Sequence, residues 1–477
     1  MTLRIMFVEP PKDFWFVMGE YLPPPLGILS LAAYLREHDD TLEIEIVDCQ
    51  AERITWRELK TRIGVFDPDI LAPSSLSTCN VYRGLRTIEM AKKANPSTTT
   101  IVGGQHFSVL AKESLETYPE LDIVVRGEGE QTLLEVVRAL KGLGSLSDVK
   151  GITFRHDGRI ITTEDRPLFE NLNDLPFPAY DLVGSFMKEY HFTMMAGRDT
   201  PYALVEASRG CPHDCNFCTQ CAYWGGRWRP KTPKRIADEF EYLYNEFDTR
   251  FFWLTDDNFG LGKRTEELCD EIIKRGFAED ILWFMQARCD DVVKYERLLP
   301  KLRKSGLHWI LAGVESHSPE TLASFNKRID PSVSKEAMGL LKLNDIFAQA
   351  TLIIGERSDS HDTLRGLRAY VNDLDPDIAI FMILTPYPGT RLYNEAEKNG
   401  WIEDKNWAHY DMIHAIMPTE HLTLREVQEE LYLCYRSFYG SMKRRIAGVF
   451  SSNKIKRRTY RYMARQGVMG ALRGLFR

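Results

Sequence analysis

The chain is poor in cysteine, with nine in 477 residues, and their odd number and wide scatter are not those of a disulfide framework. Its start has no cationic region followed by an apolar run, and no stretch of about eighteen consecutive apolar residues occurs anywhere. Internal repeats and low-complexity segments are also missing. We therefore expect a cytoplasmic protein that does not span a membrane. The 44% hydrophobic and 27% charged residues exclude disordered and fibrous classes.

Acidic residues are missing from the end of the chain. Residues 441–477 contain eleven Lys or Arg and no Asp or Glu, so the remainder of this chain of net charge −7 carries −18. The tail interleaves its charges with apolar side chains, which is typical of peripheral segments on anionic membrane surfaces, here the inner membrane face. The alternatives to membrane contact are that the tail binds an acidic partner, that it packs against the rest of the chain, or that it is simply solvated. Nucleic acid is not expected, because no groove reader or single-strand platform is visible elsewhere.

The length of 477 residues exceeds what one hydrophobic core usually supports, so we expect several domains. In residues 1–145, short apolar strands alternate with amphipathic helices, which predicts an α/β domain with a doubly wound parallel sheet. Ligands of such sheets bind beyond the carboxyl ends of the strands. The small or polar residues there are candidate cofactor-binding residues, although each is also explained as an ordinary turn residue: Ser75, Ser77, Gly103, Gly104, His106, Gly127 and Gly129.

Four further segments follow. We interpret residues 146–200, with the predicted hairpin GITFRHDGRIITT and a proline-rich stretch, as a linker. In residues 201–400, six strand candidates alternate with helices, which predicts a partial (β/α)6 barrel of TIM type with its chemistry on loops at the carboxyl ends of the strands. Residues 401–440 are predicted as a helical C-terminal segment, and residues 441–477 as a basic tail.

Three cysteines lie close together directly after the first predicted barrel strand. Cys211, Cys215 and Cys218 form a C-x3-C-x2-C pattern in the stretch SRGCPHDCNFCTQC. Zinc, with Cys221 or His213 as fourth ligand, is one possible occupant, although zinc sites more typically use paired C-x2-C units. A four-iron cluster held by only three cysteines is another, and it leaves one iron free to bind a substrate or cofactor.

The stretch CPHDCNFC resembles the motif of radical S-adenosylmethionine (SAM) enzymes, and its place after the first barrel strand matches that superfamily. Together with VGGQH and VVRGEGE in the first domain and LTPYPGTRL in the barrel, it resembles the cobalamin (B12)-binding radical SAM enzyme family over roughly residues 1–420. The resemblance implies a cobalamin-binding first domain, a radical SAM barrel, and a [4Fe-4S] cluster, SAM and cobalamin as cofactors.

The resemblance also assigns residues. Cys211, Cys215 and Cys218 would be the catalytic and metal-binding residues, ligating three irons while SAM chelates the fourth. Residues matching the family's SAM site are Phe217 beside the adenine, Asp256 and Asp257 near the amino group, Glu315 and Ser316 near the ribose or amino group, and Gly355 near the adenine. Two of these have simple structural alternatives: Asp257 as the cap of the following helix, and Glu315 in an ion pair with Arg288.

Two further points concern the cofactors. The D-x-H-x-x-G pattern that supplies cobalamin with a protein histidine is absent, and His106 has Gly104 where Asp is needed, so no histidine is expected on cobalt. Cys221 is interpreted as a neighbour of the cluster, because a fourth thiolate would block the iron that SAM needs.

The function that the resemblance implies is methyl transfer to an unactivated carbon, through a 5′-deoxyadenosyl radical and methylcobalamin. A radical cyclase or rearrangement enzyme of the porphyrin-cyclase type is the alternative within enzymes, and a carrier or sensor that holds cobalamin or the cluster without turnover is the alternative outside them. A one-electron reductant such as flavodoxin or ferredoxin is the implied partner. The substrate, which could be a protein side chain, lipid, tetrapyrrole or small natural product, is not identified. Candidates to line its site, or simply to pack on the barrel, are Trp407, His409, Tyr410 and His414.

Overall fold

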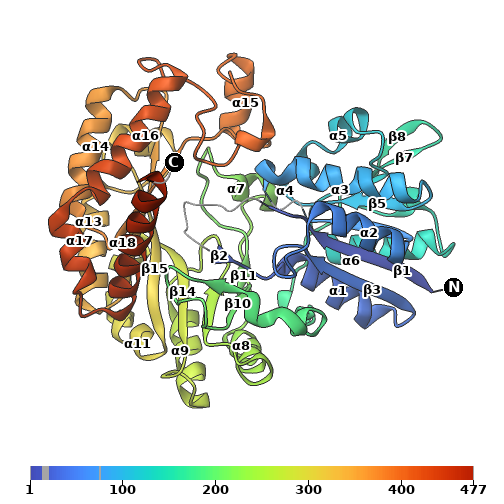
Figure 1. Cartoon of the computed structure of the whole chain (residues 1–477), viewed down its shortest axis with the longest axis horizontal. Coiled ribbons are helices and arrows are strands. Elements are labelled where there is room, and N and C mark those ends of the chain that lie inside the picture. Colours follow the sequence, from blue (N-terminus) through green and yellow to red (C-terminus); the bar gives the residue numbers. More distant parts are fainter. Residues whose placement is uncertain (1, 13–20, 75–76, 476–477) are drawn as a thin grey trace.

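The computed structural model describes residues 2–12, 21–74 and 77–475, so the predicted cofactor-binding residue Ser75 lies outside the described residues. Two lobes lie side by side (Figure 1). The N-terminal lobe is built on one sheet and the larger lobe on a second sheet, with the C-terminal helices packed on the outside of the second lobe.

The first sheet has seven strands in the order β3-β1-β4-β5-β6-β7-β8. Its first five strands in the chain are parallel: β1 (Leu3–Glu9), β3 (Leu42–Asp48), β4 (Ile70–Pro73), β5 (Thr99–Val102) and β6 (Ile123–Val125). Strand β1 shows why they are strands: Ile5 and Phe7 pack into one hydrophobic core and Met6 and Val8 into another on the opposite face. A sheet buried on both faces selects continuous apolar runs.

Helices cover both faces of this sheet. Helices α1 (Leu26–His38) and α6 (Gly129–Leu140) contact one another and join the core of Ile5 and Phe7, whereas α2 (Trp56–Phe66) and α3 (Val81–Ala94) join that of Met6 and Val8. The short α4 (Gln105–Val109) and α5 (Ala111–Thr117) lie with the second pair. The predicted doubly wound arrangement is confirmed.

The hairpin predicted within the connecting segment extends this sheet. Strands β7 (Ile152–His156) and β8 (Arg159–Thr162) are antiparallel, and β7 pairs with β6. Further along, β9 (His191–Phe192) pairs with β2 (Tyr21–Leu22) from the start of the chain, and Tyr21 packs against the barrel residue Trp253. This part of the chain also holds the 3₁₀ helices η3 (Leu146–Asp148), η4 (Leu172–Asp174) and η5 (Tyr180–Glu189).

The second sheet is the predicted partial barrel. Its six parallel strands pair in chain order: β10 (Tyr202–Val205), β13 (Phe251–Leu254), β14 (Leu282–Arg288), β15 (Leu307–Glu315), β16 (Phe347–Ile354) and β17 (Ile378–Ile383). The alternating helices, with the short η6 (Glu296–Leu298), are α8 (Pro233–Phe247), α9 (Lys263–Arg275), α10 (Cys289–Lys294), α11 (Leu299–Lys304), α12 (Pro319–Ser324), α13 (Pro331–Leu343), α14 (His361–Leu374) and α15 (Arg391–Lys398).

The inside of the barrel is filled by side chains at its lower end, toward the amino ends of the strands, and is partly exposed at its upper end, toward their carboxyl ends. Phe284 and Trp309 stack with ring centroids 4.1 Å apart, and Phe192 lies 5.5 Å from Trp309, all three fully buried. Two residues further up the same strands, Gln286 and Leu311 are partly exposed. Because side chains alternate along a strand, these residues share the interior face with the aromatic rings below them. The interior face of the barrel is therefore accessible to solvent toward the carboxyl ends of these strands.

Residues 401–440 differ from the helical prediction. Helix α16 (Leu424–Tyr439) fills their second half, but the first half holds only η7 (Trp407–His409). The Asn406 side chain accepts from Ala408 N at 3.1 Å, and Asp411 accepts from Ile413 N at 2.9 Å. Such local side-chain bonds to the backbone compete with helix formation, and so this part of the segment is irregular.

The basic tail forms two helices, α17 (Met442–Val449) and α18 (Lys454–Leu475). Lys456 pairs with Asp377 at 2.7 Å, the Tyr460 hydroxyl donates to Asp377 O at 2.9 Å, and the Thr459 hydroxyl donates to Met194 O at 3.2 Å. The tail is thus packed on the body of the protein through at least residue 460. Within the described residues, no helix has both the length and the apolar character needed to span a membrane.

Candidate functional site

The cysteine loop begins at a turn that only glycine fits. Strand β11 (Ser208–Arg209) follows β10 and pairs with β12 (Arg229–Pro230), and Gly210 comes next with φ at +85°. A Cβ atom on Gly210 would lie far inside contact distance of the Arg227 carbonyl oxygen. The path of the chain into the cysteine loop therefore depends on the absence of a side chain at this position.

Asp256, predicted at the SAM amino group, holds the entrance to the same loop. Its carboxylate accepts hydrogen bonds from Ala207 N at 3.1 Å and from the Ser208 hydroxyl, which itself accepts from Trp228 Nε1 at 3.1 Å. Burial raises the pKa of Asp256 to about 6. The side chain is thus occupied by the backbone and hydroxyl of the loop entrance.

The three thiols are suited to hold a metal cluster by their chemistry and position. Cys211, Cys215 and Cys218 are free, partly exposed and on one loop. Burial raises the pKa of each thiol. A hydrogen bond from a backbone N–H acts in the opposite direction at Cys211 and Cys218, and the charges of Lys327 and Arg288 act in the opposite direction at Cys215. Among the described residues, no three His, Cys, Asp or Glu side chains are gathered into a ready-made metal site, so ligation requires the thiols to draw together. The donor set fits a cluster with three protein ligands.

Asp257 follows β13 and lies within electrostatic range of Cys211 and Cys218. Loss of water around its carboxyl group, with Asp256 and Glu206 close by, raises the pKa of Asp257 to about 7. Helix α9 has Gly262 as its N-cap, so Asp257 does not cap it. Phe217, on the same loop, packs edge-on against Phe325 at 5.0 Å.

Glu315 is paired, but with a lysine that sequence reasoning missed. Lys327 Nζ lies 2.5 Å from Glu315 Oε1, and the Thr351 hydroxyl donates to Glu315 Oε2 at 3.3 Å. Arg288, the partner suggested from the sequence, instead bonds Asp290 at 2.9 Å. Glu315 also has a left-handed backbone, with φ at +63°. Its position at the end of β15 is therefore fixed by both backbone and side chain.

Ser316 and Gly355 lie at the ends of neighbouring barrel strands. The Ser316 hydroxyl accepts from Ser318 N at 3.2 Å, and Gly355 N donates to Asp359 Oδ2 at 2.8 Å. The structure therefore brings the predicted SAM-binding residues to one end of the barrel, around its opening.

The predicted cobalamin-binding residues that the structure describes lie at the carboxyl ends of β4, β5 and β6. Gly104 and Gly127 have φ of +89° and +72°. The buried His106 Nδ1 has no hydrogen-bond partner in the described part of the chain, and burial lowers the pKa of its imidazole to about 4. A neutral imidazole with an unpaired nitrogen beside small residues fits a large polar ligand at this edge of the sheet. Ser77 is the N-cap of the short helix η2 (Thr78–Asn80), which follows β4, and its hydroxyl accepts from Asn80 Nδ2 at 2.8 Å.

The irregular segment around η7 lies against the N-terminal lobe. The rings of Trp407 and His106 are 5.0 Å apart, and Trp407 and Tyr410 are 4.7 Å apart. His409 stacks on His414 at 4.6 Å, and they bond Asp404 and Asp411 at 2.6 and 2.8 Å. Trp407 is thus beside the predicted cofactor residue His106, whereas the two histidines are held by local carboxylates.

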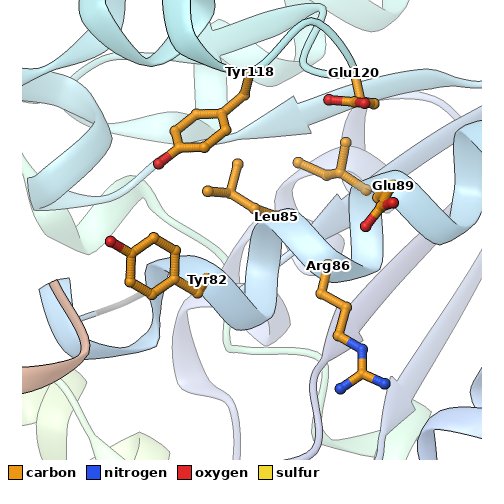
Figure 2. Close-up of a pocket in the computed structure, with 7 residues that line it drawn as sticks. Tyr82, Leu85, Arg86, Glu89, Tyr118 and Glu120 are labelled. Carbon is orange, nitrogen blue, oxygen red and sulfur yellow. The ribbon is translucent and has the colours of Figure 1, made fainter. Parts of the chain in front are cut away.

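A surface cavity of about 390 Å³ lies elsewhere, between α3 and the segment that follows α5 (Figure 2). Its lining contains none of the predicted site residues and consists of Tyr82, Leu85, Arg86, Ile88, Glu89, Tyr118 and Glu120. We assign it no role in the chemistry.

Comparison with known proteins identifies both lobes. A family model described as the B12 binding domain matches residues 18–137, and one described as the Radical SAM superfamily matches residues 205–366. An uncharacterized methyltransferase of Pyrococcus horikoshii is 31% identical over 94% of this chain and 95% of that protein. The anaerobic magnesium-protoporphyrin IX monomethyl ester cyclase of Cereibacter sphaeroides is 29% identical over 92% of this chain and 70% of that protein.

The fold has a solved counterpart. The radical S-adenosylmethionine methyltransferase TsrM from Kitasatospora setae, with cobalamin and a [4Fe-4S] cluster bound, has a TM-score of 0.71 at 15% identity, covering 92% of this chain and 89% of that chain. A B12-binding α/β domain joined to a radical SAM barrel defines a class of enzymes that work with two large cofactors. This chain belongs to the cobalamin-binding radical SAM enzyme family, with a [4Fe-4S] cluster, SAM and cobalamin as its cofactors.

Proposed function

We propose that this enzyme is a C-methyltransferase that acts on an unactivated carbon. The observation that carries the proposal is the 31% identity to the uncharacterized methyltransferase of Pyrococcus horikoshii along nearly the whole of both chains. The cyclase relative, at 29% identity over 92% of this chain, keeps a radical cyclisation as the second candidate. Enzymes of this class need a substrate and a reductant, and we propose a flavodoxin or ferredoxin as the one-electron donor.

In this proposal the cluster is held by Cys211, Cys215 and Cys218. SAM is held by residues at the barrel opening, Phe217, Asp257, Glu315, Ser316 and Gly355, with Asp256 acting through the loop entrance that it fixes. Cobalamin is held by Ser75, Ser77, Gly103, Gly104, His106, Gly127 and Gly129. The chemistry that these groups supply when bound is one-electron cleavage of SAM and transfer of a methyl group.

The protein's own residues orient the loop that carries the three cysteines and keep water away from the barrel interior. Gly210 and Asp256 set the direction of the cysteine loop, and the Glu315–Lys327 pair fixes the end of β15. The buried rings of Phe284 and Trp309 close the lower end of the barrel to water. Exclusion of water protects reactive carbon species from side reactions.

The test uses SAM with a trideuterated methyl group. Protein from cells grown with hydroxocobalamin is reconstituted anaerobically with iron and sulfide. It is then incubated with this SAM, a reductant and candidate extracts, and the products are analysed by mass spectrometry. A methyltransferase is expected to add the labelled methyl group to a carbon of one compound. The matched control is the Cys218→Ala variant in the same extract.

Two results would contradict the proposal. Loss of hydrogen from a substrate without gain of the label would favour cyclisation. Failure of the full-length protein to retain hydroxocobalamin would exclude a methyl group carried by cobalamin.

The spectra of bound cobalamin are expected to show no histidine nitrogen on cobalt.

We also propose that the enzyme is cytoplasmic and that its helix α17 contacts an anionic membrane surface, so that the enzyme acts at the periphery of the membrane. Met442, Ile446 and Phe450 are 63%, 55% and 76% exposed and form a stripe along one side of this helix. Lys443 and Arg445 are exposed and flank the stripe, whereas Gly448 faces inward against the Tyr460 ring. An apolar stripe between cations is the pattern of helices that lie on anionic lipid.

Vesicle sedimentation tests this contact. The wild type is expected to pellet with phosphatidylserine-containing vesicles at low salt and to stay in the supernatant at high salt, because each cation contributes about 1 kcal/mol that salt screens. Replacement of Met442, Ile446 and Phe450 by serine is expected to abolish pelleting. The control is Leu343→Ser, which changes an exposed leucine on α13. Equal supernatant fractions for wild type and triple variant at low salt would contradict the contact.

A further inference from the structure

Building on the proposed function, we infer that Arg209 is a positioning residue that fixes the cysteine loop against the cobalamin-binding loop of the first domain. Arg209 is separated from Cys211 only by Gly210. Its guanidinium bonds two carboxylates of the first domain, Glu128 at 2.7 Å and Glu130 at 2.6 Å. These two residues flank Gly129, and Gly127 precedes them. A single side chain thus connects the segments in which the two cofactor sites are proposed.

Each nitrogen of Arg209 has its own acceptor. Nη1 donates to Glu128, Nη2 to Glu130 and Nε to Glu206 at 3.0 Å, so the guanidinium lies at the centre of three carboxylates. Glu206 itself follows β10, within the barrel lobe. The planar fork of arginine can bond three acceptors in fixed directions, whereas the ammonium of lysine acts as a point charge.

Glu128 has a second cationic partner from the barrel lobe. Arg229 Nη1, in β12, donates to both Glu128 oxygens at 3.0 and 2.9 Å and to Phe169 O at 2.7 Å. Phe169 N donates to Glu128 Oε2 at 2.6 Å. Because β12 pairs with β11, the two arginines are held side by side by the short hairpin around the cysteine loop.

The network is buried and strongly coupled. The side chains of Arg209, Glu128 and Glu130 are 7%, 3% and 6% exposed. Burial disfavours the charge on Arg209, but Glu130, Glu206 and Glu128 outweigh it and raise the pKa of the guanidinium. Burial likewise disfavours the carboxylate of Glu130, and Arg209 outweighs it and lowers the pKa of Glu130. Removal of one partner from such a network leaves uncompensated buried charge.

Two further contacts between the first domain and the helix that follows the cysteines support the role. The Tyr223 hydroxyl, in α7 (Thr219–Trp224), donates to Gly127 O at 2.6 Å, and Gln105 Nε2 donates to Gln220 Oε1 at 3.1 Å. Figure 1 shows α4 and α7 meeting between the lobes. Reacting atoms must be held about 3–3.5 Å apart, and a misplacement of about 1 Å slows a reaction strongly. A rigid link between the loops proposed to carry the two cofactors therefore serves the transfer itself.

The test compares Arg209→Lys and Glu130→Gln with Arg275→Lys. Arg275 is a matched control because it also bonds three carboxylates, those of Asp238, Glu241 and Glu271, but on α8 and α9. In cofactor-free protein, amide hydrogen exchange is expected to lose protection by about tenfold at both residues 127–130 and 208–211 in the two test variants. The control is expected to leave both segments unchanged.

A second measurement uses loaded protein without substrate. Electron paramagnetic resonance of the reduced cluster and cob(II)alamin is expected to give a single narrow distance distribution in the wild type and in Arg275→Lys. In Arg209→Lys and Glu130→Gln the distribution is expected to be about twice as wide, with iron and cobalamin contents unchanged.

The outcomes separate the inference from the proposed function. Unchanged exchange at residues 127–130 in Arg209→Lys, an unchanged distance distribution, or loss of iron from the variant would each overturn the positioning role. A wild type that binds no cobalamin would instead overturn the proposed function. In that case the exchange experiment, which uses no cofactor, still decides whether Arg209 links the two loops.

Discussion

Replacement of Cys211, Cys215 or Cys218 by alanine is expected to abolish cluster binding and reductive cleavage of SAM. A cluster with three protein thiolates has no spare ligand, and each lost thiolate exposes a further iron to solvent. The cleavage depends wholly on the cluster, because no protein side chain supplies the electron. Iron content, the visible absorption of the cluster and the amount of 5′-deoxyadenosine formed under anaerobic conditions measure the effect.

The control is Cys221→Ala, on the same loop. Cys221 Sγ donates to Asp214 Oδ1 at 3.3 Å, and we place it beside the cluster as a neighbour. This variant is expected to keep its iron and its SAM cleavage. Stoichiometric zinc without iron absorption in the wild type, or loss of the cluster in Cys221→Ala alone, would contradict the assignment of the three ligands.

Replacement of Gly210 by alanine is expected to reduce iron content and SAM cleavage by at least about tenfold, which corresponds to about 1.4 kcal/mol. A residue other than glycine at φ of +85° costs about 1–2 kcal/mol by itself. The added Cβ would also collide with the Arg227 carbonyl oxygen, a backbone atom that moves only if β12 moves. The cysteine loop would therefore leave β11 in a different direction, and Cys211 would be displaced first.

Gly225→Ala separates the two causes. Gly225 lies at the end of α7 with φ of +59°, and nothing lies within 4 Å of the position that its Cβ would take. This variant has the backbone strain without the collision, so it is expected to lose stability but to bind iron normally. Equal iron loss in both variants would show that the collision at Gly210 is not the cause.

Much of the fold followed from local patterns in the sequence. The apolar runs of the first sheet and the barrel are long enough and bounded clearly enough to define strands, and their alternation with amphipathic helices defines two parallel sheets. The cysteine spacing is local too, since Cys211 and Cys218 lie on one loop. These features needed no knowledge of what packs against what.

Features that depend on distant residues were missed. Glu128 and Glu130 stand in the quoted VVRGEGE, but their partner Arg209 is 81 and 79 positions further on, and nothing local joins them. The pairing of Glu315 with Lys327 rather than Arg288 also depends on a loop that folds back over the barrel. The irregular path around Asn406 was missed because its apolar residues suggested a helix, whereas its side chains bond the backbone.

The Arg209 network bears on how the enzyme is made. Partial separation of the two lobes would break several buried charge pairs before water could solvate the separated charges, so a slightly opened form is unfavourable. Cobalamin is large, and its proposed site lies beside these contacts. We therefore expect the cofactor to be acquired during folding, before the lobes dock, and to stay through many turnovers. Supply of cobalamin to the growing cells, rather than to the purified protein, is then the effective way to obtain fully loaded enzyme.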